Sequence, residues 1–451
     1  MPTPGGEKWD NRSLFILIWP LVIEQILAVT MGAADTVMVS SVGEYAVSGV
    51  NIIDNINNLL IIAFIALSTG GAVVVSQYIG RRDNQKVNMA SRQLFYFVIV
   101  ISVFMMLIAL GLRVPIIIFF YGNIGPDVLE AASIYFMITA ISYPFLAVYS
   151  ASAALFRAAG NSKVTMRIAI LVNVIHIGLN YVLIYHVKIG IAGAAISTLV
   201  SRILAAIILM TLLVKNRRGP LNLEGLLKIS INRPILQSIL KIGIPSALES
   251  SMFQIGRLFT QRLFAPFGTY AMAANAVTSV INSFSFMPGN AFGLALLTVV
   301  GQCVGAGDYE GAKRYANKLI KISFIVIFIL SLLIYIFMDP LTNLFSLSPE
   351  ARELTKTFVS VHCITMALAW TFSFALPCAL RAAGDARFVM IAAAITMWTV
   401  RVSGAYFMVY VVKAGPLSVW LAMGGDMLAR GTIYLTRWLS GKWREKKVLS
   451  D

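Results

Sequence analysis

Acidic side chains lie inside the first long apolar segment of the chain, where ionisable groups are uncommon. Glu24 and Asp35 are eleven residues apart, so a helix would place them within about 20° of one face and roughly 16 Å apart in depth. A carboxylate in an apolar helix is costly, and such residues usually bind ions, relay protons or pair with an opposite charge. Asp35 could instead lie in water at the end of the segment, near Val39, whereas Glu24 lies deeper.

A second polar stripe is formed by Asn51, Asp54 and Asn58, which follow an i, i+3, i+7 pattern among isoleucines and leucines. These positions share one face of a helix, so we expect the carboxylate and the two amides to face a substrate cavity. Hydrogen bonding between packed helices is the alternative explanation for the asparagines, including the neighbouring Asn57.

The same spacing recurs at Asn173, His176 and Asn180, which a helix confines to roughly a 60° arc. Imidazole titrates near neutral pH, and amide oxygens suit hard cations such as Na⁺. The pattern therefore predicts cation binding or proton relay, although a histidine between helices often only packs.

The composition indicates a membrane protein. Of 451 residues, 58% are hydrophobic and 12% charged, whereas a soluble domain is about 45–50% apolar and about 25% charged. Apolar stretches near the roughly 20 residues that cross a bilayer recur along the chain. We expect twelve spans, at residues 14–39, 47–78, 92–113, 131–156, 164–186, 190–214, 236–264, 271–302, 317–338, 354–380, 388–412 and 415–439.

The two halves of the chain repeat each other at an offset of about 225 residues. The register pairs Pro20 with Pro245, Glu24 with Glu249, the group Gln77, Gly80 and Asp83 with Gln302, Gly305 and Asp308, and Arg157-Ala-Ala-Gly160 with Arg381-Ala-Ala-Gly384. Because each half has an even number of spans, six, both halves begin on the same side of the membrane, and the repeats have parallel topology. We predict an all-α membrane protein with twelve transmembrane helices in two six-helix lobes related by a parallel internal repeat. Its expected parts are a tail (1–13), an N-lobe (14–214), a linker (215–235), a C-lobe (236–439) and a basic tail (440–451).

The net charge of +16 follows from the distribution of Lys and Arg. Basic residues concentrate in the loops on the side of the termini, above all within residues 215–241, and this bias predicts that both termini are cytoplasmic. Anionic membrane lipid accounts for the remaining basic surface, and no nucleic-acid partner is needed.

Sequence motifs argue against an enzyme. The chain has no G-x-x-x-x-G-K-[ST] phosphate loop and no H-E-x-x-H metal helix. Twelve spans in parallel repeats, without an energy-coupling domain, are typical of a secondary transporter that is driven by an ion gradient and needs no cofactor beyond the transported ion.

The halves differ in their polar residues. Asp35, Asp54, Asn173, His176 and Asn180 correspond to Thr260, Ser279, Met397, Val400 and Gly404, so the ionisable cavity belongs mainly to the first half. The prolines Pro20 and Pro245 free backbone carbonyls, and we expect hinges there.

The second half contains its own buried charges, Arg257, Arg401, Asp426 and Arg430. Asp426 and Arg430 are spaced i, i+4, which favours a neutralising pair, and Arg401 would reach Asp426 from the neighbouring helix. A structural role is therefore expected, with binding of a substrate anion as the alternative.

Several of these motifs together resemble the MATE (multidrug and toxic compound extrusion) family of transporters. They are Pro20 followed by Asp35-Thr-Val-Met-Val, Gly70-Gly71-Ala72 leading to Ser76-Gln77-Tyr78-Ile79-Gly80, and the Arg-Ala-Ala-Gly turns at 157 and 381. The resemblance covers nearly the whole chain, from about 14 to 440.

The resemblance implies export of organic, drug-like cations in exchange for Na⁺ or H⁺ by alternating access. By the family pattern, Asp35 is the first-helix aspartate of the cation site, with Asn173, His176 and Asn180 as fifth-helix ligands, where many members carry Asp at the position of Asn180. Asp35, Asn173 and Asn180 would hold Na⁺ if it is used, and Glu24 is a further coupling candidate. Glu249 is assigned to the cavity, because residues 354–380 lack the acid that the second-lobe site of the NorM-like branch requires.

We therefore expect a monomeric antiporter in the prokaryotic inner (plasma) membrane. A flippase for lipid-linked oligosaccharides and a non-transporting membrane scaffold are the alternatives. The acidic first half argues against a site for pyrophosphate, and buried acids would be an unexplained cost in a scaffold.

Overall fold

The computed structural model describes residues 9–122, 124–215, 220–221, 223, 225–226 and 230–449. The described residues are helical apart from turns and short connections, and they contain no strand. The remaining residues, which include parts of the predicted tails and of the basic linker, lie outside the described part of the chain.

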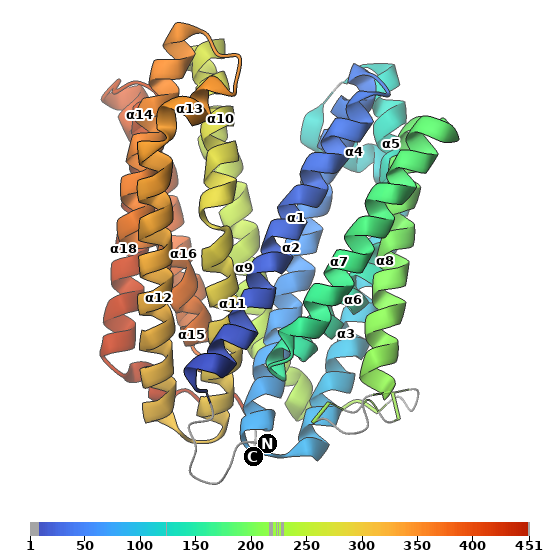
Figure 1. The fold of residues 1–451 in the computed structure, drawn as a ribbon, viewed down its shortest axis with the longest axis vertical. Coiled ribbons are helices and arrows are strands. Elements are labelled where there is room, and N and C mark those ends of the chain that lie inside the picture. Colours follow the sequence, from blue (N-terminus) through green and yellow to red (C-terminus); the bar gives the residue numbers. More distant parts are fainter. Residues whose placement is uncertain are drawn as a thin grey trace. The chain divides into compact units, whose positions relative to one another are not determined.

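The helices of the first half follow the predicted spans (Figure 1). They are α1 (Asn11–Ser40), α2 (Glu44–Gly80), α3 (Asn84–Gly111), the short α4 (Arg113–Tyr121), α5 (Pro126–Ile141), α6 (Tyr143–Ala158), α7 (Ser162–Tyr181) with a π-helical end (Val182–His186), and α8 (Gly190–Lys215). The fourth predicted span is bent by 48° between α5 and α6, where Pro144 begins the second helix.

The second half repeats this order. It comprises α9 (Arg233–Arg262), a 3₁₀ turn (Ala265–Phe267), α10 (Thr269–Ser285), α11 (Met287–Gly305), α12 (Tyr309–Ile336), α13 (Met338–Asn343), α14 (Pro349–Thr365), a π-helical stretch (Met366–Ala375), α15 (Leu376–Ala382), α16 (Ala386–Thr396), a second π-helical stretch (Met397–Ser403), α17 (Gly404–Tyr406), a third (Phe407–Val411), α18 (Leu417–Leu439) and a terminal 3₁₀ turn (Lys442–Glu445). The predicted span 271–302 is two helices, because Pro288 starts α11 after a break at Phe286.

Each of the twelve predicted spans corresponds to one helix or one series of consecutive helices. Nine helical segments of the described chain are long and apolar enough to cross a membrane, and the bent pair α5 and α6 makes a tenth. The other two predicted spans, 236–264 and 415–439, are α9 and α18, which carry charged residues within the helix. The all-helical, membrane-spanning architecture is confirmed.

The duplicated sequence motifs are helix caps and turns. Asp83 accepts a hydrogen bond from Lys86 N at 2.9 Å, and Asp308 accepts one from Gly311 N at 2.7 Å, so each aspartate caps the helix that follows. The Arg-Ala-Ala-Gly turns end at Gly160 and Gly384, whose φ values of 81° and 100° favour glycine. These motifs fix helix boundaries rather than a reaction site.

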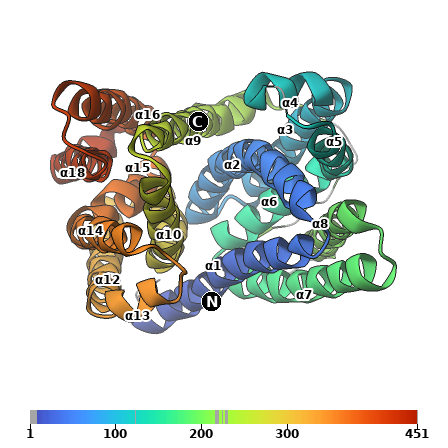
Figure 2. The same cartoon turned by 90° about the horizontal axis from the view of Figure 1, so that it is seen from above.

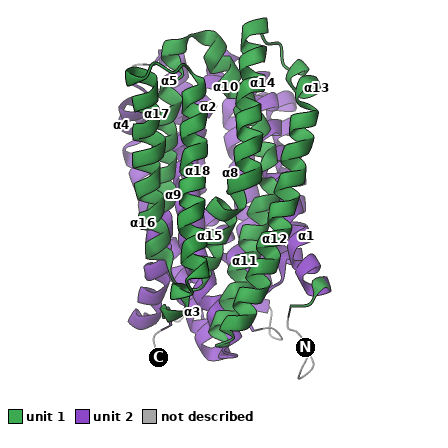
Figure 3. Ribbon diagram, turned by 90° about the vertical axis from the view of Figure 1, so that its left-hand side faces the viewer, with its two compact units in different colours: residues 1–11, 248–448 green, residues 12–247, 449–451 purple. Residues whose placement is uncertain are grey.

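Two compact units divide the chain (Figure 3). We call the one mainly of residues 12–247, unit 2 in the figure, the first unit because it comes first in the chain, and the one mainly of residues 248–448, unit 1 in the figure, the second unit. The division falls within α9 and not in the linker. A Cβ added to Gly70 of α2 would lie 2.6 Å from the backbone N of Gly243, so the first part of α9 packs closely on α2. This close approach explains why residues 233–247 belong to the first unit.

Candidate cation-coupling site

The Asp35 carboxylate, near the end of α1, contacts the polar face of α7. His176 Nε2 lies 2.7 Å from Asp35 Oδ1, and Asn180 Nδ2 donates to the same oxygen at 2.6 Å. The side chain of Asp35 is 26% exposed, whereas that of His176 is 2% exposed. A solute therefore reaches the carboxylate first, with the imidazole behind it.

Two serines of α8 complete this group on its buried side. Ser197 Oγ donates to Asn180 Oδ1, and Ser201 Oγ lies 3.2 Å from His176 Nδ1. Helices α7 and α8 lie side by side, which brings both serines to the polar face of α7 (Figure 2). We refer to Asp35, His176, Asn180, Ser197 and Ser201 as the Asp35 cluster.

Hydrogen positions follow from counting donors in the Asp35 cluster. Ser201 has one hydroxyl hydrogen and donates it to Ser197 O at 2.6 Å, so the contact with His176 Nδ1 needs a proton on the ring. The 2.7 Å contact between Nε2 and Asp35 Oδ1 also needs a proton, because two bare lone pairs would repel. A proton placed between Nε2 and Oδ1 would satisfy the short contact of the His176–Asp35 pair.

A second carboxylate lies in the same unit. Asp54 of α2 is exposed and accepts a hydrogen bond from Tyr135 of α5 at 3.2 Å. It lies within electrostatic range of Asp35 and of Arg202 on α8. Arg202 is fixed by donating to Ser142 Oγ at 2.6 Å.

The polar residues of α2 differ in exposure according to their position on the helix. Asn51 and Asn58 are exposed, like Asp54. Asn57 is 3% exposed and contacts the hydroxyls of Thr139 and Tyr143 at 3.3 and 2.7 Å, so its role is packing. An exposed polar face is thus separated from a buried structural amide on one helix.

Asn173 does not join the Asp35 cluster in the described structure. Its amide donates to Ala169 O of its own helix at 2.8 Å, as a solvent-poor asparagine commonly does. The expectation that Asn173 and Asn180 act together is therefore replaced by a site in which Asn180 alone of the two contacts Asp35.

Glu24 and Glu249 are both held in ion pairs with the arginines of the repeated turns. Arg157 Nη1 lies 2.8 Å from Glu24 Oε1, and Thr165 donates to Glu24 Oε2 at 3.0 Å. In the other unit Arg381 Nη2 contacts both oxygens of Glu249, at 2.7 and 2.8 Å. Each carboxylate is neutralised by its arginine. The geometry therefore favours an architectural role for Glu24 rather than cation coupling, and an architectural role for Glu249 rather than contact with the substrate.

Sequence reasoning missed Ser197, Ser201, Arg202 and Tyr135. The i, i+4 spacing of the serines next to an arginine in an apolar segment was an available signal. Serines are common in membrane helices, however, so their spacing predicts a site only when the helix that faces them is known.

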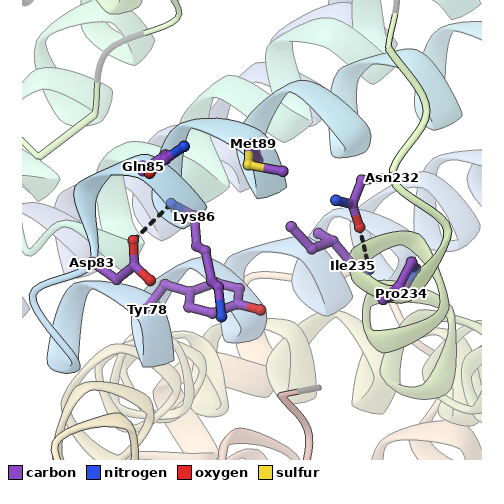
Figure 4. Close-up of a pocket in the computed structure, with 8 residues that line it drawn as sticks. All are labelled: Tyr78, Asp83, Gln85, Lys86, Met89, Asn232, Pro234 and Ile235. Carbon is purple, nitrogen blue, oxygen red and sulfur yellow. Dashed lines mark hydrogen bonds between the residues drawn. The ribbon is translucent and has the colours of Figure 1, made fainter. Parts of the chain in front are cut away.

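A cavity of about 250 Å³ lies elsewhere in this unit, between the turn that joins α2 to α3 and residues 232–235 (Figure 4). Lys86 Nζ lies over the Tyr78 ring, 5.8 Å from its centroid, and Asp83 is occupied as a helix cap. None of the predicted coupling residues lines this cavity. Among the described residues, no group of three or more His, Cys, Asp or Glu side chains could hold a metal ion.

The helical architecture and the buried charges define a multi-span membrane transporter, and comparison with known proteins gives its family. A family model described as MatE matches twice, at residues 20–182 and 244–407, in agreement with the internal repeat. The chain belongs to the MATE family of multidrug efflux transporters, whose members are transporters and not enzymes.

Relatives match along almost their full length. The chain is 26% identical to an uncharacterised transporter, YisQ, of Bacillus subtilis, covering 96% of this chain and 95% of that protein. It is 27% identical to a probable multidrug resistance protein, NorM, of Thermotoga maritima, covering 98% and 94%.

Solved structures share the fold. A MATE protein in a bent conformation aligns with a TM-score of 0.88 at 20% identity, covering 96% of each chain. A transporter of the MOP superfamily from Pyrococcus furiosus, whose structure was described as having a binding pocket of reversed polarity, aligns with a TM-score of 0.88 at 20% identity, covering 97% of each chain.

Proposed function

We propose that the chain exports amphipathic organic cations from a prokaryotic cell in exchange for protons, with the Asp35 cluster as the coupling site. The observation that carries this proposal is the 2.7 Å contact between His176 Nε2 and the partly exposed carboxylate of Asp35, which could share one proton. A group that must gain or lose one proton when its environment changes can couple transport to a proton gradient.

Charge balance gives the exchange its physical basis. In the first unit, Arg157 neutralises Glu24, and Arg202 lies within range of Asp35 and Asp54. With the shared proton bound, these three carboxylates, two guanidiniums and one proton sum to zero. Loss of the proton leaves one negative charge in an apolar environment, which an organic cation can neutralise.

Protons are favoured over Na⁺ by the orientation of Asn180. Its Nδ2 faces Asp35, while its Oδ1 accepts from Ser197. A bound Na⁺ requires oxygen ligands, so the carboxamide would have to turn and give up both hydrogen bonds. The imidazole beside the carboxylate can accept a proton without any such rearrangement.

The exposed stripe of Asp54, Asn51 and Asn58 is the proposed contact for the substrate. Its carboxylate supplies attraction for a cation, and its amides supply hydrogen bonds that do not demand one geometry. Such a surface suits chemically varied cations.

A pH-driven flux assay tests the proposal. Protein reconstituted in liposomes should move a fluorescent organic cation when a pH gradient is imposed. A sodium gradient at equal pH on both sides should not drive the movement. Transport that follows sodium and ignores pH would contradict proton coupling while leaving export itself intact.

The basic loops further support a topology in which both termini face the cytoplasm. In a variant without the three native cysteines, Arg82→Cys in the turn after α2 should resist an impermeant thiol reagent in intact cells, and Tyr121→Cys after α4 should react. Both positions are exposed. The opposite labelling pattern would reverse the assigned orientation.

A further inference from the structure

A cluster of buried arginines in the second unit is not used by the proposed coupling mechanism. Arg401 lies in the π-helical stretch Met397–Ser403 and Arg430 in α18, and they are 3% and 2% exposed. Both reach Asp426, which is fully buried: Arg430 Nη2 lies 3.2 Å and Arg401 Nη1 3.8 Å from Asp426 Oδ2. The pairing expected from the i, i+4 spacing is present, but one carboxylate serves two guanidiniums.

The net charge of this cluster is positive, also when the neighbouring ionisable residues are counted. Arg257 of α9 lies within electrostatic range of Arg401 and adds a third guanidinium. Glu249, another acid of this unit, is paired with Arg381. Two buried arginines therefore share one aspartate, an excess of one buried positive charge, and the exposed Arg257 adds a second positive charge nearby. Uncompensated buried charge is strongly unfavourable, so a counterion bound here would stabilise the folded protein.

Unused hydrogen-bonding atoms point to the same conclusion. Among the described residues, Arg401 Nε and Arg430 Nε are buried donors without a hydrogen-bond partner, whereas Asp426 Oδ1, also unpartnered, is an acceptor and would not contact an anion. Guanidinium N–H groups suit carboxylate, phosphate or halide acceptors.

Aromatic rings hold the arginines in place. Phe253 of α9 lies under both guanidiniums, 5.0 Å from Arg401 and 5.4 Å from Arg430, and Phe374 lies 4.7 Å from Arg430. Arg257, one helical turn after Phe253, is exposed and so provides a point of entry. The rings offer an apolar surface beside the charges.

We propose that Arg257, Arg401 and Arg430, together with Phe253 and Phe374, form a binding site for a monoanionic group. The group is a small halide or the carboxylate or phosphate of an amphipathic molecule. This site is separate from the Asp35 cluster and does not depend on which ion drives transport. It would allow the protein to accept zwitterionic or anionic compounds as well as cations.

Thermal unfolding of the purified protein in uncharged maltoside micelles tests this proposal. The reference buffer contains sodium gluconate, whose polyhydroxylated chain is too hydrophilic for a buried site lined by aromatic rings. Replacing gluconate by chloride or hexanoate at constant ionic strength should raise Tm by roughly 3 °C, because binding to the folded state alone stabilises it. Hexanol should have no such effect. A larger shift with hexanoate than with chloride assigns the site to amphipathic anions, and the reverse assigns it to halide.

Variants separate anion binding from ordinary ion pairing. Arg401→Gln should lose the anion-dependent rise in Tm, yet be no less stable than the unmodified protein in gluconate, because it removes an uncompensated charge. Arg257→Gln, at an exposed position, should weaken the anion response and leave the gluconate Tm unchanged. The matched control is Arg437→Gln, also in α18, which breaks the balanced 2.7 Å pair with Asp385. It should lower Tm in every buffer and keep the anion-dependent rise.

Two results would overturn the proposal. One is that neither chloride nor hexanoate raises the Tm of the unmodified protein. The other is that the rise persists unchanged in both Arg401→Gln and Arg257→Gln.

Discussion

Replacing Asp35 by asparagine is expected to reduce pH-driven export of an organic cation to the rate seen in protein-free liposomes. The amide is nearly isosteric with the carboxylate, so the helix contacts persist, but it can neither carry the charge nor share the proton with His176. Measuring flux at equal amounts of reconstituted protein checks the result. An unchanged rate would remove Asp35 from the coupling role.

Two asparagines of α7 provide matched controls for this prediction. Asn180→Ala removes a hydrogen bond to Asp35 and one of the two acceptors of Ser197, so export should fall strongly. Asn173→Ala removes only a bond to the backbone of its own helix, and export should be close to normal. Equal loss in both variants would mean that the whole face of α7 is needed for folding rather than for coupling.

The second large effect is expected from breaking the repeated ion pairs. Arg381→Gln leaves the carboxylate of Glu249, 11% exposed, without its bidentate partner. The loss of one partner of a buried pair costs about 3–5 kcal/mol, which corresponds to a fall in Tm of roughly 5 °C or more for a chain of this size. Thermal unfolding in detergent micelles measures it.

Removing both charges should recover much of this loss. In the double variant Glu249→Gln, Arg381→Gln no charge is left unpaired, and ion-coupled export should persist if the pair is architectural. Lys356→Gln is the surface control, because its partners Asp339 and Glu353 are 69% and 74% exposed, and exposed pairs contribute little to stability. A double variant that folds well but fails to export would show that Glu249 has a functional role.

Local spacing singled out three of the five members of the Asp35 cluster, and the family resemblance placed them together. Asp35, His176 and Asn180 stand out because polar residues at helical spacing in an apolar segment share one face. The same rule grouped Asn173 with them, and it could not foresee that the Asn173 amide bonds to its own backbone. Whether a polar side chain joins the site depends on its rotamer and on the helix that faces it.

Partners that are distant in sequence were harder to predict. Arg157 is 133 residues from Glu24, and no periodicity connects them. The internal repeat nevertheless contained the information, since both the glutamate and the arginine recur in the second half, and residues that recur together are candidates for one interaction. The breaks at Ser142 and Phe286 followed from prolines within long apolar runs, which the hydropathy pattern alone joins into single spans.

The most direct test of proton-coupled exchange is the release of protons when a substrate cation binds. Purified protein in weakly buffered solution is titrated with tetraphenylphosphonium at a pH where the Asp35–His176 pair holds its proton, and the pH change is read with an indicator dye. The account predicts about one proton released per cation bound, as the charge balance around Asp35 requires, and none from Asp35→Asn. Cation binding without any proton release from the unmodified protein would contradict it.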